Sequence, residues 1–259
     1  MDTVELFDMR FSRVTFPELC EQLDRRILSR NPGYICTPNV DHICQFHRKA
    51  AYREDYREAY KRAWMVVADG VPVLWASRLF GKRLPAKLSG SDLVLSLSGH
   101  AASKGHSVYF LGAAEGVAAA AAERLRERYP GLHVSGAYSP VYGFYADEAE
   151  SSRVAARVRE AGPDLCFLAL GGPHQEIWMS KYAAACNAPV MIGIGGSFDL
   201  VTGRVKRAPV WMQRCGLEWV WRLCQEPKRL WRRYLVDDLF IFVLLFRELG
   251  RLLGRVFRP

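Results

Sequence analysis

Residues Asp164–Asp199 read DLCFLALGGPHQEIWMSKYAAACNAPVMIGIGGSFD, and they set the pattern for the rest of the chain. Two short apolar runs, Leu165–Leu170 and Val190–Ile194, flank a longer segment that begins at Pro173. Each run is too short for a helix and lacks alternating polarity, which is typical of strands covered on both faces. The segment between them predicts a helix, because proline suits a first helical turn. The stretch therefore predicts a strand–helix–strand unit with parallel strands and a right-handed crossover.

Each of these two predicted strands ends in a pair of glycines. Gly171 and Gly172 follow the first strand, and Gly195 and Gly196 follow the second. In parallel sheets, ligands bind beyond the carboxyl ends of the strands, where glycine lets the backbone approach closely and helix N-termini offer free N–H groups to anions. A single turn of this kind is about as often a tight turn without a ligand. Two of them on neighbouring strands favour a phosphate or nucleotide site.

The same alternation of short apolar runs and longer helical segments extends through most of the chain. After a short strand pair at the N-terminus, further strands are predicted at 34–37, 64–68, 107–112 and 132–135. Helices are predicted at 16–30, 39–46, 53–62, 71–80, 91–103, 115–129 and 147–161. This order predicts an α/β fold, a Rossmann-like parallel sheet flanked by helices.

The carboxyl ends of the predicted strands collect polar residues at one edge of the sheet. They deliver Thr37 with Asn39, Asp69 with Gly70, and the glycine turns that lead to Gln175 and Asp199. Asp69 follows a buried strand and precedes a glycine, so it could cap the next helix or anchor a loop. The functional alternative is a general base that accepts a proton from a substrate hydroxyl.

Charge divides the chain into two parts. The sequence has 36 Lys and Arg against 27 Asp and Glu, a formal net charge of +9. Residues 204–259 hold 13 basic and 5 acidic residues, which leaves +8 there and +1 in residues 1–203. We therefore expect two domains, a Rossmann-like body (residues 1–203) and a basic helical C-terminal appendage (residues 204–259).

The end of the appendage predicts a basic amphipathic helix. Arg247, Arg251, Arg255 and Arg258 are spaced by four, four and three residues, which places them on one helical face, and Leu and Phe residues take the complementary positions. Such a helix suits a membrane interface, and its run LFIFVLLF is too short to span a bilayer. The alternatives are a helix docked on the protein's own core or on a second subunit. Nucleic acid is disfavoured as a partner, because the aromatic residues follow a helical period.

Composition disfavours several other classes of protein. The seven cysteines form no CxxC pair and several lie in apolar runs, so reduced structural thiols are expected. The N-terminal residues carry charges where a signal peptide needs an apolar core, which predicts a cytoplasmic protein. No GxSxG, HExxH or GxxxxGK motif occurs. His42 and His47 are five apart, so we interpret each as a polar helix position rather than as half of a metal pair.

Seven segments, in order, resemble the WecG/TagA/CpsF family of bacterial glycosyltransferases (glycosyltransferase family 26). Between Thr37 and Leu235 they read TPNVDH, VVADGVPVLWASRLFG, LPAKLSGSDL, YFLGA, LGGPHQE, GIGGSFDLVTGRVKRAP and WMQRCGLEWVWRLCQEPKRLWRRYL. The resemblance implies an inverting transfer of a sugar, without metal or cofactor, from a UDP-sugar to a polyprenyl-diphosphate-linked saccharide. The reaction would take place at the inner face of the cell membrane and build teichoic acid, common antigen or exopolysaccharide. A homo-oligomer is compatible with the resemblance.

Matched motif by motif, the resemblance implies roles for individual residues. Asp69 matches the catalytic base, and Gln175 matches a glutamine near the reacting groups. The residues that would bind the substrates are Thr37 and Asn39 at the sugar, Gly195, Gly196 and Asp199 at the nucleotide, Gly171 and Gly172 in the adjoining turn, and Lys87, Arg214, Arg222 and Arg229 at the diphosphate. No residue is expected to bind a metal. Lys87 stands where an arginine is expected and lacks the bidentate fork of arginine, so Arg83 or an arginine of the appendage could take its place.

Two other functions stay open at this point. One is a non-catalytic, membrane-associated protein that binds a nucleotide sugar. The other, more distant, is a dinucleotide-dependent oxidoreductase, since GIGG is a weak dinucleotide signal. Relatives use N-acetylmannosamine, its uronic acid or glucose as the donor sugar, and TPNVDH with VADG favours the exopolysaccharide glucosyltransferase branch.

Overall fold

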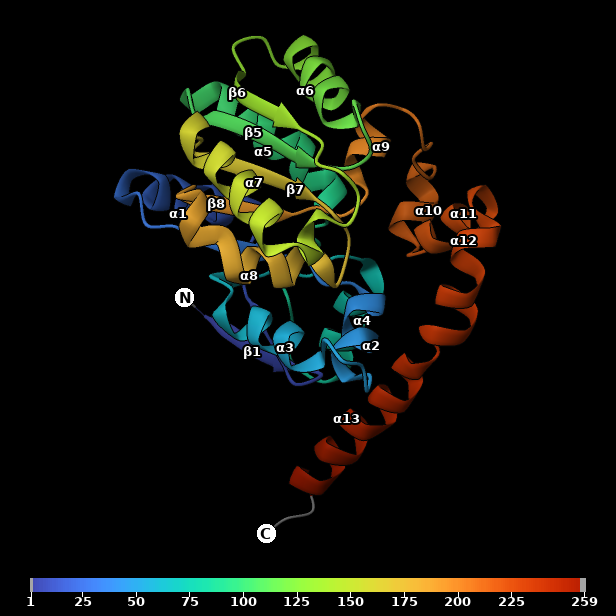
Figure 1. The fold of residues 1–259 in the computed structure, drawn as a ribbon. Coiled ribbons are helices and arrows are strands. Elements are labelled where there is room, and N and C mark those ends of the chain that lie inside the picture. The colour runs from blue at the N-terminus through green and yellow to red at the C-terminus, as the bar shows by residue number, and fades with distance from the viewer. Residues whose placement is uncertain (1, 257–259) are drawn as a thin grey trace.

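A computed structural model describes residues 2–256 of the chain (Figure 1). Its main sheet has six strands, all parallel, in the order β4–β3–β8–β7–β5–β6. The strands are β3 (Tyr34–Cys36), β4 (Met65–Val66), β5 (Ser107–Gly112), β6 (His133–Tyr138), β7 (Leu165–Ala169) and β8 (Val190–Gly193). A separate antiparallel hairpin is formed by β1 (Thr3–Leu6) and β2 (Met9–Ser12). The predicted α/β, Rossmann-like class is confirmed, with β4 shorter than expected.

Strand β7 shows why the apolar runs lack alternating polarity. All five of its residues are buried. Phe167 packs into one core beside Phe110, with ring centroids 5.7 Å apart, whereas Cys166 and Leu168 belong to the core on the other face. Burying an apolar side chain of this size contributes about 1.5–3 kcal/mol, so a strand covered on both faces is apolar at every position.

Helices cover both faces of the sheet. The core on one face includes side chains of α1 (Phe16–Ser29), α5 (Gly90–Lys104), α6 (Val117–Arg128) and α9 (Ser197–Val201). The core on the other face includes α2 (Val40–His47), α3 (Arg53–Arg62), α4 (Val71–Leu79), the 3₁₀ turn η1 (Phe144–Ala146), α7 (Glu148–Ala161) and α8 (His174–Cys186). Pro173 is the N-cap of α8, and the helix begins at His174. The predicted start was Pro173 itself.

The C-terminal appendage is entirely helical. Its elements are α10 (Val210–Arg214), α11 (Glu218–Gln225), α12 (Pro227–Arg232), the π-helical turn η2 (Arg233–Asp237) and α13 (Phe240–Val256). Figure 1 shows α10, α11 and α12 beside one end of the sheet, and α13 running away from them past α2. Within residues 2–256, no helix combines the length and the hydropathy that crossing a membrane requires.

Helix α13 turns its charged side toward the body. Arg247 and Arg251 pair with Asp8 of the β1–β2 turn at 2.8 and 2.6 Å. Glu248 is buried and pairs with Lys82 at 3.0 Å. The arginine stripe predicted for this helix is therefore docked on the body where it is described, rather than solvated. Arg258 lies outside the described residues, and of Arg255 only the backbone is described.

A second side of α13, away from the body, is apolar and exposed. Its exposed side chains are Phe242, Val243, Phe246, Leu249, Leu252 and Leu253. The spacing of 242, 246, 249 and 253 follows the helical period, so these side chains form one continuous apolar strip. The helix is thus amphipathic as predicted, and its body-facing side carries the charged residues Arg247, Glu248 and Arg251 together with the buried Leu244.

Candidate active site

Four adjacent strands end in residues that the sequence singled out. Strands β4, β3, β8 and β7 are neighbours in the sheet, in this order. The residues that follow them are Asp69, Thr37, Gly195 and Gly171, respectively. Hydrogen bonds join these ends. The Asp69 N–H donates to the Pro38 carbonyl at 3.0 Å, and the Thr37 hydroxyl donates to the Gly193 carbonyl at 2.8 Å. The predicted gathering at one sheet edge is therefore observed.

Asp69 has a carboxyl group suited to proton transfer. Within the described residues, its side chain makes no hydrogen bond or ion pair with a protein group. Burial raises the pKa of Asp69 to about 7, although the nearby Lys87 ammonium lowers it, and Glu218 and Asp92 raise it further. A carboxylate with a pKa near the working pH can accept a proton from a hydroxyl and release it again.

Lys87 lies near Asp69 because its segment is hydrogen-bonded to the chain just beyond β4. The Leu88 N–H donates to the Ala68 carbonyl at 2.9 Å. The Lys87 ammonium then pairs with Asp92 at 3.1 Å and with Glu218 of α11 at 3.4 Å. Burial lowers the pKa of Lys87, but the two carboxylates outweigh it and the net shift is upward, so Lys87 stays a cation. Arg83 is exposed, which leaves Lys87 as the better placed of the two.

Gln175 holds the second glycine turn, Gly195–Gly196, in place by a hydrogen bond. Gly195 has a φ of +53°, a left-handed conformation that favours glycine, and its N–H donates to Gln175 Oε1 at 3.0 Å. The Gln175 amide group donates to Glu176 Oε1 at 2.7 Å. Only 1% of Gln175 is exposed, so both ends of its amide are engaged inside the protein. In this structure Gln175 positions the turn, and a direct contact with the reacting groups stays a prediction.

A chain of buried polar groups continues from Gln175 and Glu176 to the segment after β3. Glu176 is fully buried, and its carboxylate lies 3.6 Å from His42 Nε2. The other ring nitrogen of His42 lies 2.7 Å from Asn39 Oδ1, and Asn39 also caps α2. Gly172 leaves room for this arrangement, because a Cβ there would lie 2.8 Å from His42 Nε2.

His42 and His47 both lie on α2, as interpreted, but their side chains are buried rather than at the surface. His42 is buried next to Glu176, and the His47 side chain is buried with its Nε2 2.9 Å from the Phe7 carbonyl. One ring nitrogen of each lies within hydrogen-bond distance of an oxygen, that of Asn39 for His42 and that of Phe7 for His47. Spacing alone could not show the burial, because Glu176 and Phe7 lie far from α2 in the chain.

The arginines of the appendage differ in how close they come to the glycine turn. An Arg222 nitrogen lies 3.7 Å from the position that a Cβ on Gly196 would take, so this guanidinium covers the turn. Arg229 is exposed and pairs with Glu226, and Arg214 is exposed with no ion pair to any described residue. Asp199 pairs with Arg204 at 3.9 Å. Arg222 is thus the appendage arginine that reaches the predicted nucleotide turn.

Three carboxylates at this site have contacts that the sequence did not predict. Asp92 binds Lys87 and Arg207, Glu218 brings the appendage onto Lys87, and Glu176 supports Gln175. A signal existed for Asp92, since it follows Ser89 at the spacing of a capping motif, and the Asp92 N–H donates to Ser89 Oγ. Glu176 could have been inferred from its place next to Gln175. Glu218 could not, because its position depends on how the appendage folds back.

Comparison with known proteins identifies the family of this chain. The family description "Glycosyl transferase WecG/TagA/CpsF family" matches residues 4–254. A protein of Bacillus spizizenii named N-acetylglucosaminyldiphosphoundecaprenol N-acetyl-beta-D-mannosaminyltransferase is 34% identical over 249 residues, covering 96% of this chain and 93% of the relative. Proteins of the same name are 36% identical in Bacillus subtilis, over 75% of this chain and 73% of the relative, and 28% identical in Staphylococcus aureus, over 88% and 87%. The chain therefore belongs to the WecG/TagA/CpsF family of glycosyltransferases, as its motifs predicted.

Proposed function

We propose that this glycosyltransferase moves N-acetylmannosamine from UDP-N-acetylmannosamine to a polyprenyl-diphosphate-linked N-acetylglucosamine. The names of three relatives, two of them above 30% identity, support this sugar and this acceptor. They favour N-acetylmannosamine over the glucose that the sequence motifs suggested. The observation that carries the catalytic part of the proposal is the Asp69 carboxylate at the edge where four strands end, which has no hydrogen bond or ion pair to any side chain of residues 2–256.

Asp69 would act as the general base. Its carboxylate takes the proton from the attacking acceptor hydroxyl, whose oxygen forms a bond to the anomeric carbon as the bond from that carbon to UDP breaks. From an α-linked donor, this single displacement gives the β-linkage that the relatives' names carry. UDP departs with the bonding electron pair, and the product leaves after Asp69 releases its proton.

The departing diphosphate needs positive charge, which two neighbouring side chains offer. Lys87 is partly buried close to Asp69, and Arg222 covers the Gly196 turn. Preorganised cations in a partly dry site stabilise developing negative charge better than mobile solvent does. We assign the diphosphate to these two groups and the nucleotide to Gly195, Gly196 and Asp199, with no metal or cofactor.

The sugar and the outer part of the lipid substrate would be held by the surrounding residues. Thr37 and Asn39 would orient the sugar, and Gln175 would keep the second glycine turn in place. Gly171 and Gly172 form the adjoining turn. Arg214 and Arg229 are exposed on the appendage, where they could meet the diphosphate of the lipid-linked acceptor.

A lipid-linked acceptor requires the enzyme to work at a membrane surface. The outward strip on α13 supports this, since 73% of the Phe246 side chain and 55% of Phe242 are exposed. Exposed tryptophans of the appendage, including Trp211 and Trp231, add aromatic surface of the kind found at bilayer interfaces. We propose that residues 204–259 form a membrane-binding unit that holds the body at the inner face of the cell membrane.

A donor screen tests the proposal. Purified protein would be incubated with a short-chain polyprenyl-diphosphate-N-acetylglucosamine, a chelator, and each of a panel of UDP-sugars, with UDP release and product mass as the readouts. We expect transfer from UDP-N-acetylmannosamine in the presence of the chelator. Faster transfer from UDP-glucose would mean that the protein is a glucosyltransferase, as the sequence motifs suggested. UDP binding without transfer from any donor, in the presence of anionic vesicles, would favour a non-catalytic nucleotide-sugar-binding protein.

A further inference from the structure

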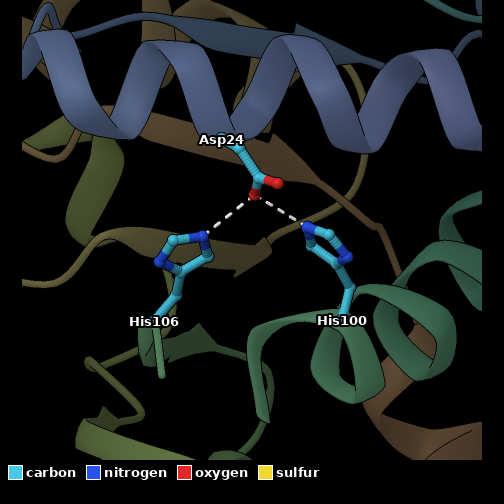
Figure 2. A group of neighbouring side chains, drawn as sticks. All are labelled: Asp24, His100 and His106. Atoms are coloured by element: carbon cyan, nitrogen blue, oxygen red, sulfur yellow. Dashed lines mark hydrogen bonds and ion pairs between the residues drawn. The ribbon is translucent and has the colours of Figure 1, made fainter. Parts of the chain in front are cut away.

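Three side chains of metal-binding types converge at the end of the sheet opposite the candidate active site (Figure 2). His100 Nε2 lies 2.7 Å and His106 Nε2 lies 2.9 Å from the same oxygen of Asp24. All three ligand atoms lie within 4.8 Å of one another. Within residues 2–256, no other group of three or more His, Cys, Asp or Glu side chains has its ligand atoms this close together.

Three different elements bring these side chains together. Asp24 comes from α1, His100 from the last turns of α5, and His106 from the residue just before β5. Gly105 ends α5 in a left-handed conformation with a φ of +72°, which turns the chain so that His106 comes back toward His100. Helices α1 and α5 are both packed into the same core, so the ligands are held on rigid elements.

The two separations between the Asp24 oxygen and the imidazole nitrogens are close to those between the ligands of a metal. Two ligands at about 2.0–2.1 Å from a tetrahedral ion lie about 3.3 Å apart. The observed separations of 2.7 and 2.9 Å would need to open by only about half an ångström to admit an ion in place of the two ring protons. Both imidazoles present the same nitrogen, Nε2, to the carboxylate.

The donor set and its exposure indicate which ion would fit. Two imidazole nitrogens and one carboxylate oxygen suit Zn²⁺ and similar divalent transition ions rather than Ca²⁺ or Mg²⁺, which prefer all-oxygen sites. The side chains of His100 and His106 are each 16% exposed and that of Asp24 is 27% exposed. The site is therefore largely enclosed by protein yet open enough on one side for a water molecule to serve as the fourth ligand.

We propose that Asp24, His100 and His106 bind one Zn²⁺ ion, which clamps α1 to α5 at the amino-terminal edge of the sheet. The site is structural, because the six residues of β5 separate its two edges by about 20 Å. Helix α5 spans the same distance in the other direction, and its first turn carries Asp92, the partner of Lys87. The clamp thus fixes the far end of the helix on which part of the candidate active site is built.

Zinc titration of the full-length protein tests the inference. The exposed Cys215 and Cys224 could bind zinc on their own, so both would be replaced by serine in every sample. After treatment with a chelator and its removal, the protein would be titrated with Zn²⁺ against a chromogenic competitor. We expect one ion bound per chain, and a rise of about 5–10 °C in Tm at a hundredfold excess of free Zn²⁺ over the Kd. Bound Co²⁺ should give the intense visible absorption of a four-coordinate site.

Variants decide whether these residues are the ligands. His100→Ala with His106→Ala should weaken Zn²⁺ binding at least a hundredfold and abolish the zinc-dependent rise in Tm, while far-UV circular dichroism without metal stays that of the parent. His133→Ala, which removes an exposed histidine on β6, is the matched control and should bind as the parent does. Asp24→Asn keeps the shape of the side chain and should also weaken binding. No saturable binding in the parent, or undiminished binding in the double variant, would overturn the proposal.

Discussion

The body and the appendage are held in place by different forces. In the body, β7 is buried along its whole length, and the fully buried Glu176 lies against His42 and Gln175. In the appendage, no side chain of α10 or α11 is buried, and α13 is tied to the body by ion pairs to Asp8. Apolar burial therefore stabilises the body, while α13 is held by ion pairs that salt can screen together with the burial of Leu244. The difference suits a rigid catalytic body with an appendage free to adjust at a membrane.

The largest effect should come from Asp69, whose carboxyl group has no side-chain partner within residues 2–256 and a pKa that burial raises to about 7. Asp69→Asn removes the base but keeps the shape of the side chain, so we expect turnover to fall about 10²–10⁴-fold while UDP binds as before. UDP release and calorimetric titration with UDP measure the two quantities. Asp55→Asn, on the exposed surface of α3, is the matched control and should retain activity. Comparable turnover in Asp69→Asn would remove Asp69 from the role of base.

The raised pKa of Asp69 predicts opposite trends for activity and stability. Because burial raises this pKa to about 7, kcat/KM should fall about tenfold for each pH unit below 7, and Asp69→Asn should lose that dependence. In the unfolded chain Asp69 ionises near pH 4, so ionising it in the folded protein costs stability between about pH 4 and 7, by at most about 4 kcal/mol.

Urea unfolding checks the stability trend. Asp69→Asn should unfold at a higher urea concentration than the parent at pH 8, and the difference should disappear near pH 4. Equal midpoints at pH 8 would mean that the carboxylate is ionised in the folded protein without cost.

Much of this contrast could be predicted from the sequence. The apolar runs around Phe167 and Ile192 predict strands buried on both faces, and parallel strands must end at a common edge, which is how Thr37 and Asp69 come together. The amphipathic period of α13 also follows from the sequence. These features depend on local pattern and on rules of sheet topology.

Other features depend on which distant surfaces meet, and local pattern does not encode that. His42 and Glu176 are neighbours because α2 and α8 meet below the site. Which side of α13 faces the body depends on Asp8, more than 200 residues away in the chain. His100 and His106 acquire a metal-like arrangement only through Asp24 of another helix. The candidate active-site edge was thus predictable, while its supporting groups were not.

The buried pair of His42 and Glu176 should contribute to stability. His42→Ala leaves the Glu176 carboxylate with Gln175 as its remaining described side-chain partner, so we expect a loss of about 2–3 kcal/mol in the free energy of unfolding. Urea titration measures it, with the exposed His133→Ala, expected to change stability by at most about 0.5 kcal/mol, as control. A change in His42→Ala no larger than in the control would show that the contact at 3.6 Å contributes little.

The outward strip of α13 should govern membrane binding. Inserting a phenylalanine into a bilayer interface contributes about 1.5–3 kcal/mol, so Phe246→Asp should weaken binding to anionic vesicles at least tenfold. Co-sedimentation measures this, and Tyr142→Asp, which changes a side chain that is 94% exposed on the body, should bind normally. If vesicle binding is unchanged while Phe246→Asp converts a dimer to a monomer, the strip is an interface between two copies of the chain.

The smallest expected effect tests whether charge alone holds α13 on the body. Asp8→Asn removes the carboxylate that pairs with Arg247 and Arg251, and asparagine tolerates the left-handed φ of +57° at this turn. Half-exposed ion pairs contribute about 0.2–1 kcal/mol each, so global stability should change little. Hydrogen exchange should nevertheless accelerate in α13 and stay constant in β7, and 0.5 M salt should produce the same acceleration in the parent. Asp2→Asn breaks a similar ion pair, to Arg13, in which α13 takes no part, and should leave the exchange of α13 unchanged. Protection of α13 that survives both Asp8→Asn and salt would mean that its apolar contacts through Leu244 hold the helix, and that the appendage is as firmly built as the body.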